Sequence, residues 1–135
     1  MLYTLCYVSS SHDNLSAKDL EHLFRVNKRN NTDLDVSGIL IYNNGNFLQI
    51  LEGDENKVKS LFKKIQGDSR HNNLITLIND NIEERIFHDY DSGFIHFEDP
   101  VKRKELHNYI GWLKEAEVKN VDKVVRIVEN FIGKS

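Results

Sequence analysis

Apolar and polar residues follow two periods along this chain, one of about two residues and one of about 3.6. Residues 2–8 form a mostly apolar run that is typical of a strand. Ser16 then fits as a helix N-cap with Asp19 at the third helical position, and Leu15 and Leu20 fit a hydrophobic staple around it. The helix is expected to end near Asn30. Its expected buried stripe is Leu20, Leu23 and Phe24.

Two further apolar runs, residues 36–42 and 46–51, flank an Asn44-Gly45 pair. Both residues of such a pair tolerate a positive φ, so the pattern predicts a β-hairpin. A second helix should begin near Asp54, because apolar side chains recur beyond it at helical spacing. These side chains are Val58, Leu61, Phe62 and Ile65.

Residues 74–78 predict a fourth strand, and residues 85–97 predict a fifth, weaker one. The order of elements is then βαββαββ. Helices that return over one face of a mixed sheet indicate an α/β (α+β) fold, in this case a ferredoxin-like sandwich.

The residues beyond this sheet favour two helices. Pro100 follows Asp99, a pair that fits the first helical position after an N-cap, and a second helix should begin near Val121. We therefore expect a sheet domain over residues 1–96 and a C-terminal two-helix extension over residues 97–135 that packs on the sheet. The expected anchors of this extension are Tyr109, Trp112 and Leu113.

Composition points to a single globular domain without strong charge. The chain has 135 residues and a formal net charge of −3, so its charge gives no reason to expect nucleic acid or an anionic membrane as a partner. The one cysteine, Cys6, lies in an apolar run, which fits a reducing compartment. The sequence lacks a signal peptide and any apolar window of about eighteen residues. We therefore expect a cytoplasmic protein that binds no membrane.

Sequence motifs for metal, nucleotide or nucleophile chemistry are absent. There is no HExxH, paired Cys-x-x-Cys, Walker loop, GxGxxG or GxSxG. Cys6 lies within a predicted strand, a poor position for a nucleophile, and the six histidines show no metal-site spacing. We therefore expect no enzyme activity and no metal site.

Three polar residues lie where the pattern also favours burial. Strand alternation puts Gln49 on one face with Phe47 and Leu51, and an unpaired buried amide costs about 1–3 kcal/mol. Gln49 therefore either has buried partners or faces water from an edge strand. Tyr7 either pairs its hydroxyl inside the sheet or serves only in packing. Asn31 closes the first predicted helix, where a polar residue most often serves only as the helix end.

These positions fall in segments that resemble BLUF domains, a family of flavin-binding blue-light sensors. The resemblance covers residues 1 to about 96. Its most specific stretch, residues 46–53, reads Asn-Phe-Leu-Gln-Ile-Leu-Glu-Gly and has the family's distance from Tyr7 and Asn31. The other matching segments are Cys6-Tyr7-Val8-Ser9, Arg29-Asn30-Asn31, Val36-Ser37-Gly38-Ile39-Leu40-Ile41-Tyr42 and Asp68-Ser69-Arg70-His71.

The resemblance implies a ferredoxin-like domain that holds an oxidised flavin between two helices. Tyr7 and Gln49 would be the photoactive pair, with Gln49 bridging Tyr7 to flavin N5 and O4, and Asn31 would hold the pyrimidine edge. Further polar contacts are expected from Asn27, Asn30, Asp68, Arg70 and His71, and apolar walls from Leu23, Leu40 and Phe47. FAD is the expected flavin, with FMN and riboflavin as alternatives.

One stretch departs from the BLUF pattern. Family members commonly carry Trp-Ser-Met on the fifth strand, residues thought to relay the change at the glutamine to the sheet. Here the relay positions hold Tyr90 and Ser92, and Met1 is the only methionine of the chain. We therefore expect retained flavin binding and photochemistry, with altered signalling or altered dark recovery.

Two other functions are compatible with a ferredoxin-like fold. An acylphosphatase-like enzyme would need an arginine in the loop after the first strand, and residues 9–14 contain none. A binding module of the RNA-binding type would need basic residues on the sheet, and residues 36–52 contain no Lys or Arg. For a light sensor without a catalytic output domain, the expected partners are a second copy of the chain, as a dimer or larger homo-oligomer, and an unidentified downstream protein.

Overall fold

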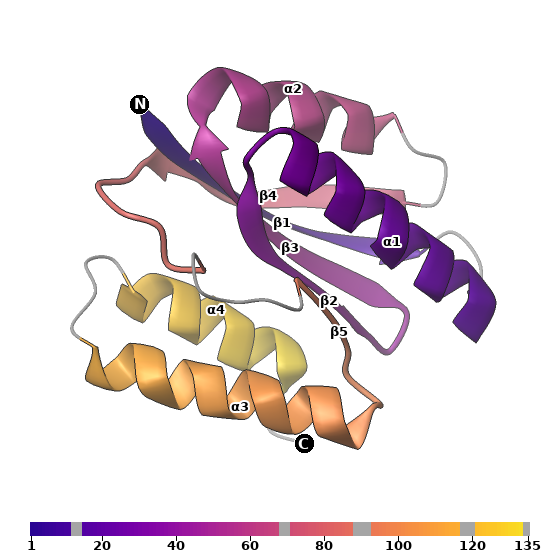
Figure 1. Ribbon diagram of the computed structural model, residues 1–135. Coiled ribbons are helices and arrows are strands. Elements are labelled where there is room, and N and C mark those ends of the chain that lie inside the picture. Colours follow the sequence, from indigo (N-terminus) through magenta and orange to yellow (C-terminus); the bar gives the residue numbers. More distant parts are fainter. Residues whose placement is uncertain (12–14, 68–70, 88–92, 117–120, 134–135) are drawn as a thin grey trace.

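The computed structural model describes residues 1–11, 15–67, 71–87, 93–116 and 121–133. These residues contain one five-stranded sheet (Figure 1). The strands are β1 (Leu2–Ser11), β2 (Ser37–Asn43), β3 (Asn46–Asp54), β4 (His71–Asn81) and β5 (Phe94–His96). Their spatial order is β4-β1-β3-β2-β5, and neighbours are antiparallel except β2 and β5, which are parallel.

Helices cover both faces of the sheet. The helices are α1 (Ala17–Asp33), α2 (Glu55–Gln66), α3 (Pro100–Glu115) and α4 (Val121–Ile132). The first two lie on one face and the last two on the other (Figure 1). The run β1-α1-β2-β3-α2-β4 with strand order 4-1-3-2 is the ferredoxin-like arrangement, so the predicted fold class is confirmed. In the described parts of the chain, no helix is long and apolar enough to span a lipid bilayer.

Local side-chain bonds set the helix starts, as the sequence predicted. The Ser16 hydroxyl accepts the N–H of Asp19 at 3.1 Å, and the Asp19 carboxylate accepts the N–H of Ser16 at 3.2 Å, which completes a capping box. Asp54 caps α2, and Asp99 caps α3. These caps satisfy amide groups that a helix cannot pair internally.

The β2–β3 hairpin turns at the predicted dipeptide. Asn44 has a φ of 52° and Gly45 a φ of 78°, as the favoured two-residue hairpin turn requires. This turn fixes the register, in which Leu40 lies opposite Gln49. The hairpin therefore places both side chains on the same face of the sheet.

The prediction of a fifth strand beginning at residue 85 is wrong. Residues 85–87 form no strand, and β5 has only three residues. The physical reason is that a side chain takes the place of a neighbouring strand. The buried Glu52 carboxylate accepts the backbone N–H of Ile86 at 2.7 Å and that of Phe87 at 2.8 Å.

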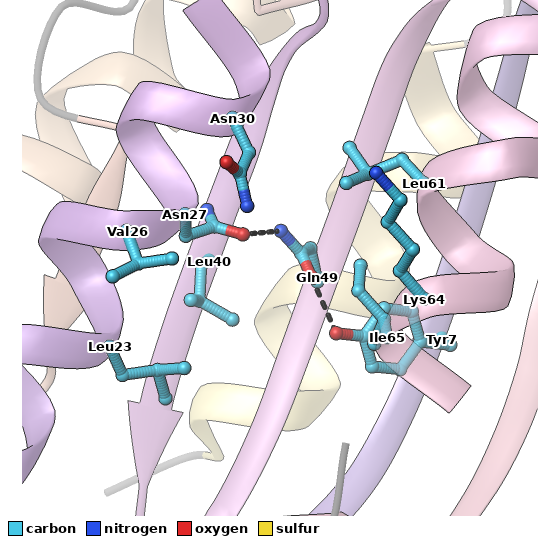
Figure 2. Close-up of a pocket in the computed structure, with 10 residues that line it drawn as sticks. All are labelled: Tyr7, Leu23, Val26, Asn27, Asn30, Leu40, Gln49, Leu61, Lys64 and Ile65. Atoms are coloured by element: carbon cyan, nitrogen blue, oxygen red, sulfur yellow. Dashed lines mark hydrogen bonds between the residues drawn. The ribbon is translucent and has the colours of Figure 1, made fainter. Parts of the chain in front are cut away.

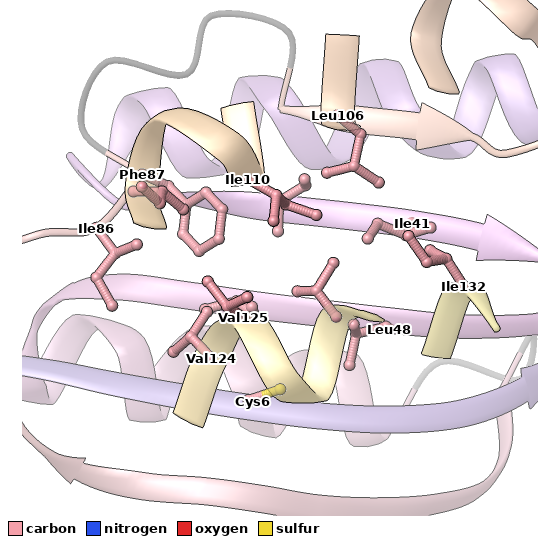
Figure 3. Packing of buried hydrophobic residues seen from close by; sticks show 14 of the residues in the cluster. Cys6, Ile41, Leu48, Ile86, Phe87, Leu106, Ile110, Val124, Val125 and Ile132 are labelled. Atoms are coloured by element: carbon pink, nitrogen blue, oxygen red, sulfur yellow. The ribbon is translucent and has the colours of Figure 1, made fainter. Parts of the chain in front are cut away.

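Each face of the sheet has its own hydrophobic core. The α3–α4 face carries one large cluster (Figure 3). Its members include Cys6, Ile41, Leu48, Ile86, Phe87, Leu106, Ile110, Val124, Val125 and Ile132. The α1–α2 face carries two smaller clusters, one around Leu5 and Tyr7 beneath α2 and one around Leu40 and Phe47 beneath α1.

One expected anchor of the C-terminal helices is wrong. Leu113 is buried, but the Trp112 side chain is 50% exposed. The buried stripe of α3 runs through Leu106, Ile110 and Leu113, at the i, i+4, i+7 spacing of one helix face. Trp112 falls beside this stripe.

Gly38 in β2 generates a stability prediction. Its φ is +147°, and a β-carbon there would lie 1.8 Å from the backbone oxygen of Ile50. Because that oxygen belongs to the sheet backbone, it cannot move without disturbing the strand pairing. We expect Gly38→Ala to lower the free energy of unfolding by on the order of 3 kcal/mol, measured by urea denaturation.

Gly111 provides the matched control. It lies inside α3, and a β-carbon there meets nothing within 4 Å. Gly111→Ala should therefore raise the free energy of unfolding by about 0.5–1 kcal/mol through helix propensity. Equal effects of the two substitutions would contradict the steric argument for Gly38.

Candidate functional site

A cleft opens between α1 and α2, with its floor on the sheet (Figure 2). We call it the central cleft. Its floor comes from β1, β2 and β3, and its walls come from the two helices. It is lined by Tyr7, Leu23, Val26, Asn27, Asn30, Leu40, Gln49, Leu61, Lys64 and Ile65.

A chain of two hydrogen bonds crosses this cleft. The Tyr7 hydroxyl donates to Gln49 Oε1 at 2.5 Å, and Gln49 Nε2 donates to Asn27 Oδ1 at 2.8 Å (Figure 2). Gln49 is 1% exposed, and Tyr7 is fully buried. Both ends of the buried amide therefore have a partner, and the alternative of an edge-strand glutamine facing water is wrong.

Sheet geometry brings the first pair together. Tyr7 in β1 lies directly opposite Gln49 in β3, in the antiparallel register of these two central strands. Residues directly opposite on one face have β-carbons about 5 Å apart, close enough for their side chains to bond. Asn27 comes from α1, so the third member depends on how this helix packs on the sheet.

A second cleft lies beside the first, around Asn31. The Asn31 cleft is lined by Asn27, Lys28, Asn31, Thr32, Val36, Ser37, Gly38, Phe87, Gly93 and Phe94. Asn27 lines both clefts, so they adjoin at this residue. Asn31 Oδ1 is buried and has no hydrogen-bond partner among the described residues. Such an orphaned acceptor is costly unless a ligand or water donates to it.

Apolar side chains flank the polar chain. Leu23 and Leu40 line the central cleft as expected, and Asn30 lies at its wall. Phe47 is fully buried beside them in the cluster beneath α1, with its ring 4.8 Å from that of Tyr42. The structure therefore brings Tyr7, Leu23, Asn27, Asn30, Asn31, Leu40 and Gln49 together around these two clefts, and Phe47 packs behind them without lining either cleft.

Other expected site residues are not described. Asp68, Arg70, Tyr90 and Ser92 lie outside the described residues. His71 begins β4, where its backbone pairs with that of Ser11. The proposed contacts of these residues stay predictions.

Four residues that line the central cleft were not predicted from the sequence: Val26, Leu61, Lys64 and Ile65. Leu61 and Ile65 lie four residues apart in the apolar stripe predicted for α2, which was assigned to the core alone. A helix that lines a cleft does so with the same apolar stripe that would pack in a core. Hydrophobic periodicity therefore cannot distinguish a residue that lines the cleft from one that packs in the core. Lys64 carried no sequence signal.

The single thiol lies away from the clefts. Cys6 is fully buried in the cluster on the α3–α4 face (Figure 3). Burial raises the pKa of this thiol to about 12, because the apolar surroundings disfavour the thiolate. Cys6 is therefore unreactive at neutral pH. Among the described residues, no group of three His, Cys, Asp or Glu side chains could hold a metal ion.

Comparison with known proteins identifies the family. The family model described as BLUF, sensors of blue-light using FAD, matches residues 2–93, which is more than half of the chain. The chain belongs to the BLUF family. Its family is described as sensors of blue light that use FAD, and the acylphosphatase and binding-module alternatives find no support in these comparisons.

Relatives extend the comparison. This BLUF chain is 39% identical over 87 residues to the blue light- and temperature-regulated antirepressor BluF of Escherichia coli, covering 64% of this chain and 22% of the relative. It is 37% identical over 86 residues to the photoactivated adenylate cyclase subunit beta of Euglena longa, of which it covers 10%. The chain thus spans less than a quarter of these relatives.

Solved structures also resemble it. Klebsiella pneumoniae BlrP1 with FMN and cyclic diGMP has a TM-score of 0.77 at 30% identity, covering 98% of this chain and 34% of that one. The dark-state structure of BlrB, a BLUF protein, has a TM-score of 0.71 at 24% identity, covering 94% of both chains. This second likeness supports the fold alone.

The clefts of this BLUF chain fit an isoalloxazine ring. The ring is flat, apolar on its faces, and edged with one N–H donor and several acceptors. The apolar side chains of the central cleft suit its faces, and the orphaned Asn31 Oδ1 is an acceptor without a donor. Ligand sites of this kind combine apolar walls with a few fixed polar groups.

One wall of the Asn31 cleft depends on a buried carboxyl. Phe87 lines that cleft, and Glu52 holds its backbone N–H. Burial raises the pKa of Glu52 above its usual value of 4.5, opposed by the N–H groups of Ile86 and Phe87, the Ser37 hydroxyl and the Arg85 charge. Desolvation is the dominant cause because the side chain is fully buried.

This shift predicts a pH dependence of stability. Between pH 4.5 and its folded-state pKa, Glu52 holds its proton in the folded chain and releases it in the unfolded one. The contribution of Glu52 to the free energy of unfolding should therefore be fully present below pH 4.5 and be lost as pH rises through the folded-state pKa. Urea unfolding at several pH values should show wild type losing stability relative to Glu52→Gln as pH rises. A difference that is independent of pH would contradict the raised pKa.

Proposed function

We propose that Tyr7, Gln49 and Asn27 form the light-responsive hydrogen-bond chain of this BLUF sensor. The observation that carries the proposal is the buried run from the Tyr7 hydroxyl through the Gln49 amide to Asn27. It borders a cleft in which the side-chain oxygen Oδ1 of Asn31 lacks a donor among the described residues. In this proposal Asn31 holds the pyrimidine edge of the flavin, and Gln49 bridges Tyr7 to the ring.

A bound flavin supplies blue-light absorption and an excited state that takes up an electron and a proton. The Tyr7 hydroxyl already points its proton at Gln49 Oε1, so its loss from Tyr7 changes what Gln49 accepts and donates. Gln49 can respond by rotating its amide or by tautomerising, and either change alters its bond to Asn27. The net charge of the cleft stays constant while its hydrogen-bond pattern changes, which suits a two-state switch.

The remaining contacts follow from position along the same elements. We assign Asn30, Asp68, Arg70 and His71 to polar contacts with the ring edge or side chain of the flavin. We assign FAD as the flavin, in line with the family description, with FMN as the alternative that the BlrP1 structure illustrates. The apolar walls are Leu23, Leu40 and Phe47.

Residues 1–96 are the proposed flavin-binding unit and residues 97–135 the proposed output extension. The signal leaves through protein contacts, made with a second copy of the chain and with a downstream protein, in the cytoplasm. The E. coli relative is described as a blue light- and temperature-regulated antirepressor. Tyr90 and Ser92 occupy the usual relay positions, so we expect altered signalling or dark recovery with intact photochemistry.

The first test is the spectrum of the flavin-loaded chain before and after blue light. Wild type should show a reversible red shift of its flavin bands. Tyr7→Phe removes the proton that bonds Gln49, and Gln49→Leu removes the amide, so each variant should keep the flavin and lose the shift.

Tyr3→Phe is the matched control. Tyr3 is a second buried tyrosine on the same strand and face, packed beneath α2. Its loss of a hydroxyl should leave the red shift unchanged. A shift that survives in both Tyr7→Phe and Gln49→Leu would refute the mechanism, and a wild-type protein that refuses flavin would refute the proposed function.

The second test concerns flavin affinity. Asn31→Ala removes the orphaned acceptor, so we expect the Kd for flavin to rise about tenfold, equivalent to roughly 1.4 kcal/mol. Titration of the flavin-free protein, followed by quenching of flavin fluorescence, measures this change. Asn130→Ala, at an exposed position of α4, is the control and should leave the Kd unchanged. An unchanged Kd in Asn31→Ala would exclude the assigned contact.

A further inference from the structure

The segment between β4 and β5 is held by side chains of two different elements. Ile86 and Phe87 are buried although they belong to no strand. From β3, Glu52 accepts both of their backbone N–H groups, at 2.7 and 2.8 Å. The segment is therefore attached to the same strand that carries Gln49, three residues away.

The opposite side of this segment is held by α3. The Tyr109 hydroxyl donates to the backbone oxygen of Ile86 at 2.7 Å. The Tyr109 ring also lies on that of Phe87, with centroids 5.8 Å apart and planes inclined by 24°. The Ile86 backbone is thus bonded through its N–H to the sheet and through its carbonyl oxygen to the C-terminal helices. We call these contacts the Ile86 clasp.

The Ile86 clasp also borders the candidate flavin site. Phe87 lines the Asn31 cleft together with side chains from α1. Figure 3 shows Phe87 and Ile86 among the buried residues between the sheet and the C-terminal helices. A change at the cleft that moves Phe87 or β3 must therefore change the position of the Ile86 carbonyl that Tyr109 bonds.

We infer that Tyr109 is the positioning residue through which α3 responds to the state of the flavin site. The inference rests on the proposed function and adds a route for the signal to leave. Coupling between two sites requires a contact whose free energy differs between the two states. A hydrogen bond to a buried carbonyl meets this requirement, because it weakens steeply with distance and angle. The apolar contacts of α3 with the sheet are less sensitive to such small shifts.

The chain carries its own reporter of α3. Trp112 is its one tryptophan, and its ring lies 5.6 Å from that of Tyr109. Its emission under selective excitation therefore reports the surroundings of this part of α3. Hydrogen–deuterium exchange of the α3 amides gives a second, independent readout.

The experiment compares flavin-loaded wild type with Tyr109→Phe, each in the dark and under blue light. The variant keeps the ring and its stacking on Phe87 and loses only the hydroxyl. We expect both proteins to show the same red shift of the flavin bands. In wild type, light should change the Trp112 emission and the hydrogen–deuterium exchange of the α3 amides. In Tyr109→Phe, each of these light-induced changes should be at most half as large. Tyr3→Phe, which removes a buried hydroxyl on the other face, should behave as wild type.

The outcomes separate the two proposals. A wild-type protein without a red shift overturns the proposed function, and with it this inference. A normal red shift with no light-dependent change in α3 overturns the inference alone, as does a Tyr109→Phe variant whose α3 changes equal those of wild type. A purely structural role for Tyr109 would alter the dark and light states equally and leave their difference intact. Glu52→Gln, which weakens the clasp from the sheet side, should reduce the same difference, and full retention in both variants would also overturn the inference.

Discussion

The buried amide of Gln49 is the constraint on which the arrangement of the site depends. An amide inside a sheet face must have partners at both ends, and here they come from two elements, Tyr7 of β1 and Asn27 of α1. The strand register supplies the first partner, and helix packing supplies the second. The position of α1 is therefore tied to the sheet by a polar bond as well as by apolar contacts. A change at the Gln49 amide therefore alters hydrogen bonds to both β1 and α1.

The two faces of the sheet differ in how tightly their helices cover them. The α3–α4 face holds one continuous cluster, in which strand residues such as Leu48 and Ile50 meet helix residues such as Leu106 and Val125. The α1–α2 face holds two smaller clusters with the central cleft between the helices. A slot for a flat ligand needs helices that do not close over the sheet. The cleft reduces apolar packing beneath α1 and α2, and the α3–α4 face can compensate with its own close packing.

Features coded by neighbouring residues were predictable from the sequence. The Ser16 N-cap and the Asn44-Gly45 turn depend on a few adjacent residues, and both predictions are confirmed. The pairing of Tyr7 with Gln49 was implied by the BLUF resemblance, whereas strand alternation alone left the partners of both residues open. The role of Glu52 was not predictable, because its partners are backbone groups more than thirty residues away. The same carboxylate binds the backbone of residues 86 and 87, where a strand was expected. The missed role of Glu52 and the wrong strand prediction therefore have one cause.

The Asn31 cleft shows a similar limit. Asn31 was identified by its place in the pattern, but its lack of a partner is a property of the assembled structure. Trp112 shows the reverse case, since its apolar ring suggested burial while the helix turned it outward. In both, the deciding factor is the rotation of a helix about its axis relative to the sheet. A helix rotation that differs by one residue moves a side chain from the wall of the cleft to the solvent-exposed surface.

The burial of Cys6 has a practical consequence for following light-driven motion in this protein. The chain has no other cysteine, and this one is sealed in the core with a pKa of about 12. A thiol introduced on α3 or on β4 would therefore be the only one that reacts with a maleimide or a spin label. Distances between such probes can be measured in the natural sequence background, without first replacing the native cysteine.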